Sequence, residues 1–283
     1  MFIILFSVTI ISVYFEGMCR RLFSFKNVKK LVVKVGTSSI AYPTGHINLR
    51  RIEKLVKVIS DIKNSGIDIV LVSSGAIGVG CGKLKINRAD CDTSAKQAAA
   101  AVGQCELMYM YDKIFSSYNH IVAQVLLTHD VIDNPDRKEK AIDTFRRLFE
   151  LGAIPIVNEN DTVSLEEIEA TFGENDTLSA IVATLVGADA LVIMSDIDGL
   201  YDSDPRKNPC AKLISEVRSI DPSIISSAGE AGSESGTGGM KTKLNAAKIV
   251  MDANIGMAIL NCSDPAILYD LLDGKDVGTR FFK

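Results

Sequence analysis

The chain has 283 residues, of which 47% are hydrophobic and 23% are charged. This is enough apolar material for a large buried core, and because no Pro-, Gly- or Ser-rich linker divides the chain, we expect one domain rather than two. With 31 basic and 35 acidic residues, the formal net charge is −4. Nucleic-acid-binding proteins usually present a basic face, so this balance argues against a nucleic-acid partner and favours a small-molecule substrate.

The six cysteines and three histidines do not have the spacing of a metal site. No C-x-x-C pair occurs, and His46, His120 and His129 do not cluster with the cysteines in the sequence. We therefore expect free thiols in a reducing compartment and no zinc site.

The first fifteen residues, MFIILFSVTIISVYF, are apolar, and Met18 and the basic segment CRRLFSFKNVKK come soon after them. The run is short for a transmembrane helix, and it lacks the positive start and small-residue cleavage site of a signal peptide. Three interpretations stay open, in this order: translation that starts at Met18 instead of Met1, a membrane anchor, or a basic organelle-targeting arm. We leave residues 1–27 outside the expected fold, place the domain at residues 28–283, and expect a cytoplasmic protein.

From Lys30 onward, short apolar runs alternate with amphipathic segments. Runs rich in β-branched residues predict strands, and apolar residues at three- and four-residue spacing predict helices. In chain order we expect a strand at 31–35, a helix at 52–62 ended by Gly66, a strand at 69–72, a helix at 94–117, a strand at 122–127, a helix at 136–151 ended by Gly152, a strand at 154–157, a helix at 176–186, a strand at 190–194, a helix at 240–253, a strand at 257–260, and a last helix capped by Asp264, with Pro265 at its first position and Gly274 at its end.

This alternation of strands and helices predicts an α/β fold. Continuous apolar strands are typical of a parallel sheet that is covered by helices on both faces, so we expect a three-layer αβα sandwich with a mostly parallel central sheet. In such sheets, ligands bind at the carboxyl ends of the strands. Four unusual loops follow predicted strands or precede predicted helices.

The first loop, Lys34 to Ser39, ends the first predicted strand. A lysine within an apolar strand is unfavourable to bury without a partner. Lys34 therefore either reaches the surface, pairs with a carboxylate, or is a cation aimed at a phosphate. Gly36 and the hydroxyl residues behind it would offer backbone N–H donors to an anion.

The second loop, Ser73 to Gly82, contains four glycines within eight residues. Glycine lets the backbone approach a ligand closely. The segment matches neither the Walker P-loop nor G-x-G-x-x-G. A plain mobile turn is the alternative interpretation.

The third feature consists of two clusters of amide and carboxylate side chains, Asn158 to Asp161 and Glu174 to Asp176. Carboxylates hold an ammonium group, and amide N–H groups hold a carboxylate, so the clusters suit recognition of an α-amino acid. The alternative is that Asn175 or Asp176 is only the N-cap of the following helix.

The fourth loop, Gly236 to Lys243, leads into a predicted helix. The free N–H groups of a helix N-terminus form an anion site. Lys243 lies in the first turn, where the helix dipole disfavours a cation, and its position is easier to understand if it faces a phosphate. A lysine on a solvated helix face is the alternative.

Together, in this order, the loops resemble the amino acid kinase family and, within it, the glutamate 5-kinases. The resemblance runs from about Lys30 to the C-terminus and rests on LVVKVGTSS, VLVSSGAIGVG, KQAAAAVGQ, IPIVNENDTV, FGENDTLSA, SDIDGLYDSDPRKNP and GTGGMKTKLNAA. It implies transfer of the γ-phosphate of ATP to the γ-carboxylate of L-glutamate, which gives L-glutamyl 5-phosphate in the first step of proline biosynthesis. The rivals are an enzyme of the same fold that acts on acetylglutamate, aspartate, a carbamate or a nucleoside monophosphate, and an inactive regulatory member of the fold.

The resemblance also implies the roles of individual residues. Lys34, Lys243 and Asp176 would be catalytic. The substrate-binding residues would be Ser74, Gly75, Asn160, Asp161 and Asn175. ATP would be held by Lys34, Gly36, Ser195, Asp196, Thr237, Gly238, Gly239, Met240, Lys241, Thr242 and Lys243. Mg²⁺ would be held mainly by ATP phosphates, with no side chain assigned as a ligand. A carboxylate acceptor is already ionised at neutral pH, so no general base is required.

The same resemblance implies partners. Many members carry an RNA-modification-type (PUA) domain after the kinase domain, and we expect none here. We expect a homo-oligomer, either a dimer or a tetramer. Proline is expected as a feedback inhibitor that acts through the loops around residues 161–176, and the labile acyl phosphate is expected to pass to a separate glutamyl-phosphate reductase.

Overall fold

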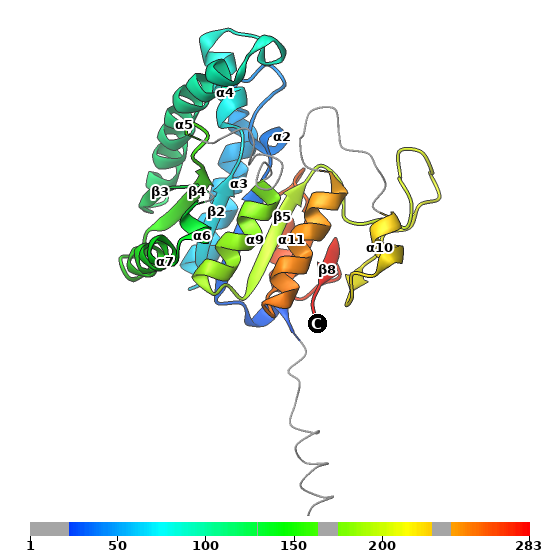
Figure 1. The fold of residues 1–283 in the computed structure, drawn as a ribbon. Coiled ribbons are helices and arrows are strands. Elements are labelled where there is room, and N and C mark those ends of the chain that lie inside the picture. The colour runs from blue at the N-terminus through cyan, green and yellow to red at the C-terminus, as the bar shows by residue number, and fades with distance from the viewer. Residues whose placement is uncertain (1–22, 129, 164–174, 228–238) are drawn as a thin grey trace, which may run out of the picture.

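The computed structural model describes residues 23–128, 130–163, 175–227 and 239–283. Within this part of the chain, eight strands form one sheet in the order β3-β4-β2-β1-β5-β7-β8-β6 (Figure 1). The strands are β1 (Lys30–Val35), β2 (Asp68–Ser73), β3 (Val122–Leu127), β4 (Ile154–Glu159), β5 (Ala190–Ser195), β6 (Glu216–Val217), β7 (Gly256–Asn261) and β8 (Thr279–Phe281). The strands from β3 to β7 in this order pair in parallel, and β8 is antiparallel to β7.

Helices cover both faces of the sheet. They are η1 (Phe25–Asn27), α2 (Thr37–Ile40), α3 (Leu49–Asn64), α4 (Ala76–Leu84), η2 (Arg88–Asp90), α5 (Thr93–Ser116), α6 (Asp130–Asp133), α7 (Pro135–Glu150), α9 (Asn175–Val186), α10 (Pro222–Ser227), α11 (Met240–Asp252) and α12 (Ile267–Leu272). Helices α3, α4, α5 and α12 pack on one face, and α7, α9 and α11 pack on the other. The predicted three-layer α/β sandwich is confirmed as a single domain.

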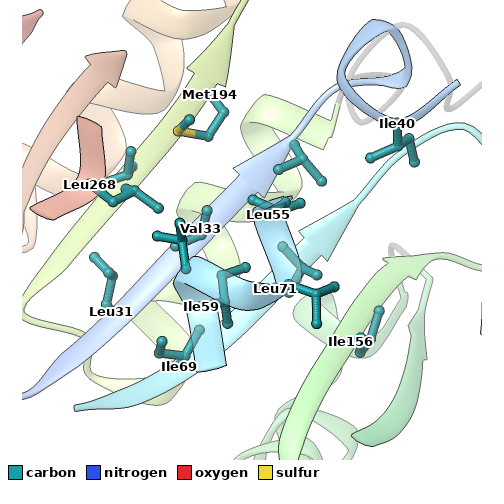
Figure 2. Packing of buried hydrophobic residues seen from close by; sticks show 14 of the residues in the cluster. Leu31, Val33, Ile40, Leu55, Ile59, Ile69, Leu71, Ile156, Met194 and Leu268 are labelled. Carbon is teal, nitrogen blue, oxygen red and sulfur yellow. The ribbon is translucent and has the colours of Figure 1, made fainter. Parts of the chain in front are cut away.

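The apolar strands serve two cores at once. Leu31 and Val33 of β1 belong to the same core as Leu55 and Ile59 of α3, and Figure 2 shows Val33 beside these two side chains. Val32, between them in sequence, belongs to the core on the opposite face. Because successive side chains of a strand point to opposite faces, a strand that is covered on both sides must be apolar throughout.

The strand order places a switch point at β1. The chain runs from β1 to its neighbour β2, and after β4 it returns to β5 on the other side of β1. Where the strand order reverses in this way, the carboxyl ends of the strands open a crevice in which ligands bind. The end of β1, with Lys34 and Val35, lies at this position.

One predicted loop is a helix. The glycine-rich segment that we expected to approach a ligand, or else to be a mobile turn, forms α4 from Ala76 onward. A Cβ atom on Gly80 would lie 1.7 Å from the Ala99 carbonyl oxygen, and a Cβ on Gly103 would lie 1.8 Å from the Ala76 carbonyl oxygen. These two glycines therefore serve the close packing of α4 against α5, and only Gly75, at φ +101°, has the left-handed turn expected of a loop glycine within this segment.

Two other boundaries differ in detail. The last helix begins at Ile267 and not at Pro265, because the Asp264 carboxylate accepts a hydrogen bond from the Ala266 N–H and forms a turn before the helix. Phe25, which lies before the predicted domain start, is buried in the core. No helix in the described ranges has the length and apolarity needed to cross a bilayer, and the apolar residues 1–15 lie outside those ranges.

Candidate active site

Three charged side chains meet where β1 ends and where α9 and α11 begin. The Lys34 Nζ lies 2.6 Å from Oδ1 of Asp176, and the Lys243 Nζ lies 3.1 Å from Oδ2 of the same carboxylate. The Thr242 hydroxyl lies 2.9 Å from Oδ2 as well. One carboxylate is therefore shared by two ammonium groups and a hydroxyl.

The fold explains how these residues come together. Lys34 has the same parity along β1 as Val32, which places it on the face that is covered by α9 and α11. Asp176 is the second residue of α9, and Lys243 is the fourth residue of α11. The helix α9 packs against β1, and α11 packs against α9 and β7, with α9 and α11 side by side in Figure 1.

The cluster is almost completely removed from water. The exposed fractions are 8% for Lys34, 1% for Asp176 and 6% for Lys243. Burial alone would raise the pKa of Asp176, but the charges of Lys34 and then of Lys243, together with their hydrogen bonds, outweigh it and lower the pKa to about 2. The carboxylate is therefore ionised at neutral pH.

Two lysines and one carboxylate leave this cluster with one excess positive charge. A buried cluster with a net positive charge attracts an anion more strongly than an exposed one would, because the surrounding dielectric is low. Asp176 holds both ammonium groups in place. The arrangement suits an anionic group such as a phosphoryl group.

A second polar cluster lies beside the first, where β2 and β4 end. The Asn175 Nδ2 lies 3.2 Å from the Ser73 carbonyl oxygen, 2.7 Å from the Ser74 Oγ and 2.9 Å from the Asn158 Oδ1. Asn175 and Asp176 are adjacent at the start of α9. This helix start therefore joins the amide cluster to the lysine cluster.

These contacts decide between the interpretations that the sequence left open. Lys34 pairs with a carboxylate, which was one of the predicted alternatives. Lys243 is buried, so the solvated-face alternative is wrong. The capping alternative for Asn175 and Asp176 is also wrong, because both residues lie inside α9, and the Asp176 oxygens face lysine and threonine side chains.

The remaining predicted substrate residues lie along the same edge. Gly75 follows Ser74 and is the N-cap of α4. Asn160 and Asp161 follow β4 and are half-buried, and the Asn160 Oδ1 accepts a hydrogen bond from the Thr162 hydroxyl. Direct contact of Asn160 and Asp161 with a substrate stays a prediction.

The predicted nucleotide residues lie at the ends of β1 and β5 and at the start of α11. Ser195 ends β5 and donates a hydrogen bond to the exposed Asp196. Gly36 is the N-cap of α2. Gly239 is the N-cap of α11, followed by Met240 and by Lys241, which is exposed; Thr237 and Gly238 lie outside the described residues. The first N–H groups of α11 can face an anion, because a glycine cap has no side chain to occupy them.

Asn158 belongs to the predicted amide and carboxylate cluster, but no role in the site was assigned to it from the sequence. It is 3% exposed and accepts a hydrogen bond from Asn175. The position of Asn158 at the end of a predicted buried strand was the sequence signal that could have indicated its role. An amide that ends an otherwise apolar buried strand must find partners inside the protein, and the amides of the neighbouring loop are within reach.

Comparisons with known proteins agree with this geometry. The model of the amino acid kinase family matches residues 29–261. A glutamate 5-kinase of Clostridium perfringens is 56% identical over 260 residues, which cover 91% of this chain and 97% of that protein. A glutamate 5-kinase of Listeria innocua is 53% identical over 260 residues, which cover 91% of this chain and 94% of that protein.

Solved structures show the same fold at low identity. A UMP kinase from Bacillus anthracis has a TM-score of 0.63 and 19% identity, covering 90% of this chain and 96% of its own. An isopentenyl phosphate kinase from T. acidophilum has a TM-score of 0.61 and 18% identity, covering 89% and 99%. The family match spans most of the sheet and both clusters, and the curated relatives extend it over nine-tenths of the sequence: the chain belongs to the amino acid kinase family.

Proposed function

We propose that the protein transfers the γ-phosphate of ATP to the γ-carboxylate of L-glutamate and so forms L-glutamyl 5-phosphate, the first step of proline biosynthesis. The observation that carries the proposal is the buried Lys34–Asp176–Lys243 cluster beside the Ser74–Asn175 hydrogen bond. The relatives at 56% and 53% identity bear the name glutamate 5-kinase.

The chemistry needs no proton transfer from the acceptor. The glutamate side chain has a reference pKa of about 4.3, so it is a carboxylate nucleophile at neutral pH. Attack on the γ-phosphorus brings two anions together, and the reaction then requires alignment and neutralisation of charge. Lys34 and Lys243, held 2.6 Å and 3.1 Å from opposite oxygens of Asp176, supply this charge in a fixed geometry.

The cluster also fits a Mg²⁺ ion that arrives with ATP. Both Asp176 oxygens already face cations, so this carboxylate is a poor candidate for a metal ligand, and the phosphate oxygens would hold the ion. When bound, Mg²⁺ neutralises charge on the phosphates. The protein's own contribution is the pair of lysines and the N–H groups at the start of α11.

The amide cluster would recognise the amino acid. Ser74, Asn158 and Asn175 bring a hydroxyl and two amides to the end of the sheet, next to the half-buried Asp161. Hydroxyl and amide groups can bind the α-carboxylate, and a carboxylate such as Asp161 can bind the α-ammonium group. We propose this division for L-glutamate.

Hydroxylamine trapping tests the proposal, because it converts an acyl phosphate into a hydroxamate. With ATP and Mg²⁺ present, we expect hydroxamate with L-glutamate and none with L-aspartate or N-acetyl-L-glutamate. No signal with glutamate from a folded protein that still binds ATP would refute the proposed substrate. Signal with another acceptor would identify that acceptor in its place.

Further parts of the proposal concern partners. Acyl phosphates are labile, so we propose that a separate glutamyl-phosphate reductase consumes the product. Proline as a feedback inhibitor, a homo-oligomeric assembly and a cytoplasmic location stay predictions. Addition of L-proline to the hydroxamate assay and sedimentation of the purified protein test the first two directly.

A further inference from the structure

We propose that Gln104, on α5, is a positioning residue that holds the Asn158 amide and, through it, keeps the substrate-side amide of Asn175 in place. Gln104 belongs to the motif KQAAAAVGQ, to which neither the lysine cluster nor the proposed chemistry assigns a role. Its Oε1 lies 3.1 Å from the Asn158 Nδ2, and the Asn158 Oδ1 lies 2.9 Å from the Asn175 Nδ2. The expected effect on the kinetics of glutamate phosphorylation rests on the proposed function. The role of Gln104 in holding the amide side chains rests on the geometry alone.

The side chains of Gln104, Asn158 and Asn175 form a chain of hydrogen-bonded amides. A backbone carbonyl sets which group of each amide donates and which accepts. The Ser73 oxygen can only accept a hydrogen bond, so the Asn175 group 3.2 Å from it must be the NH₂ group. The same NH₂ group faces Asn158, which must then offer its Oδ1. Asn158 is left with its NH₂ group pointing to α5, where it requires an acceptor.

Gln104 provides that acceptor. If its side chain were apolar, the buried Asn158 NH₂ group would lose its partner, or the Asn158 amide would rotate and place two NH₂ groups against each other. Either outcome disturbs Asn175, which also holds the Ser74 hydroxyl at 2.7 Å. An unsatisfied buried donor is more unfavourable than a missing hydrogen bond alone, so the arrangement depends on the acceptor.

The chain of amides crosses from one layer of the fold to the other. Asn158 has the same parity along β4 as Ile156, whose side chain packs in the core on the α5 face. Asn175 begins α9, on the opposite face. Gly103, next to Gln104, brings α5 so close to α4 that a Cβ atom there would meet the Ala76 backbone. The position of Gln104 is therefore fixed by helix packing before any substrate arrives.

The Asn158 NH₂ group requires a hydrogen-bond acceptor at position 104, and two substitutions distinguish this requirement from a general need for a side chain of that size. Gln104→Glu keeps an acceptor at the same distance, whereas Gln104→Leu removes it with little change in size. We expect Gln104→Leu to raise the KM for L-glutamate about tenfold, with kcat and the KM for ATP within about threefold of wild type. We expect Gln104→Glu to stay within about threefold in all three parameters.

A matched control lies two residues further along α5. Glu106 forms an ion pair with Lys83 of α4, away from the amide chain, so Glu106→Leu also exchanges a polar side chain of α5 for leucine. We expect this control to keep the KM for glutamate unchanged. An equal rise in KM for Gln104→Glu and Gln104→Leu, no rise for either, or the same rise for Glu106→Leu would overturn the positioning role.

A second measurement does not depend on activity. The side-chain NH₂ resonances of Asn158 and Asn175 can be assigned in ¹H–¹⁵N spectra by their loss in Asn158→Asp and Asn175→Asp. Gln104→Leu should shift both pairs of resonances, and Glu106→Leu should shift neither. Unchanged resonances in Gln104→Leu would refute the inference even if the enzyme phosphorylates glutamate. Shifted resonances in a protein inactive toward glutamate would support the inference and refute the proposed function.

Discussion

Asp176 is the residue on which the site is organised. Both of its oxygens face lysine ammonium groups, at 2.6 Å and 3.1 Å, and it is 1% exposed. Burying a charge is unfavourable unless it is paired, and here both buried ammonium groups are paired with the one carboxylate. The carboxylate thus aligns the two cations at the carboxyl edge of the sheet.

The two lysines should act on the transition state. We expect Lys34→Ala and Lys243→Ala each to lower kcat at least about 100-fold, by analogy with the loss of a preorganised electrostatic donor. Steady-state hydroxamate kinetics measure this. Lys248→Ala, which removes an exposed lysine of the same helix α11, serves as the control and should keep wild-type kcat. A fully active double variant of Lys34 and Lys243 would exclude the catalytic role.

Asp176 should also make stability depend on pH in acid. Its folded pKa of about 2 lies below the ordinary value of 3.8, so its contribution is complete above about pH 4 and is lost as the pH falls toward 2. Relative to pH 5, this loss reaches about 1 kcal/mol at pH 3. We expect the unfolding free energy of wild type to decrease by that much more than that of Asp176→Asn over this interval.

Urea unfolding at pH 5, 4 and 3 measures the difference. At pH 7 the variant Asp176→Asn should be less stable than wild type by about 3 kcal/mol, because it leaves two buried lysines without their carboxylate. Parallel pH profiles for the two proteins would show that the carboxylate does not titrate below its ordinary range.

At the scale of elements, α4 and α5 form the unit that supports the substrate side of the site. The N-cap of α4 is Gly75, directly after Ser74, and α5 provides Gln104. Gly80 and Gly103 let the backbones of the two helices approach so closely that a Cβ atom at either position would overlap a carbonyl oxygen. The position of Ser74 and of the amide chain thus depends on the close helix packing that these two glycines allow.

Gly80→Ala should destabilise the protein. The added Cβ would lie 1.7 Å from the Ala99 oxygen, so α4 must move away from α5, and we expect a loss of about 2 kcal/mol or more in unfolding free energy. Gly78→Ala in the same helix is the control. Its Cβ would meet only the Thr37 Cγ2, at 3.6 Å, and should be neutral or slightly stabilising. Equal stability of the two variants in urea would contradict this account of the packing.

The same elements show how far sequence alone could go. The apolar strands and amphipathic helices were predicted because their periodicity reflects burial directly, and the sheet confirms them. The helix α4 was missed because glycine disfavours helices locally, and only its packing against α5 reveals why the glycines are there. Strands β6 and β8 are short, and they pair with segments distant in sequence, so no local pattern identifies them.

The site was predicted more as a set of residues than as a geometry. Lys34, Asp176 and Lys243 were each named from motifs, but no local rule indicates that one carboxylate binds both lysines. The role of Gln104 could not be found from its motif, because an amide in a helix is most often solvated. Only the structure connects Gln104 to the site. It places β4 beside β2 in the sheet and the Asn158 amide of β4 within hydrogen-bond distance of Gln104.

At the scale of the whole molecule, the site joins distant parts of the chain. Lys34 lies on β1, at the switch point of the sheet, and Lys243 lies on α11, which begins at Met240, far later in the chain. A nucleotide that contacts both lysines therefore requires the complete fold. Its binding should stabilise the protein as a single unit, because the unfolded chain does not bring these residues together.

ATP should accordingly raise the melting temperature of the entire protein. At a concentration 100 times its Kd, a ligand specific for the folded state adds about 2.7 kcal/mol, which corresponds to a rise of about 5–10 °C for a domain of this size. Calorimetry with and without Mg²⁺ and ATP measures the shift. We expect Lys248→Ala to keep it and the double variant Lys34→Ala/Lys243→Ala to lose most of it. An equal shift in the double variant would mean that the nucleotide binds without the lysine cluster, and the site would then have to be sought elsewhere on the carboxyl edge of the sheet.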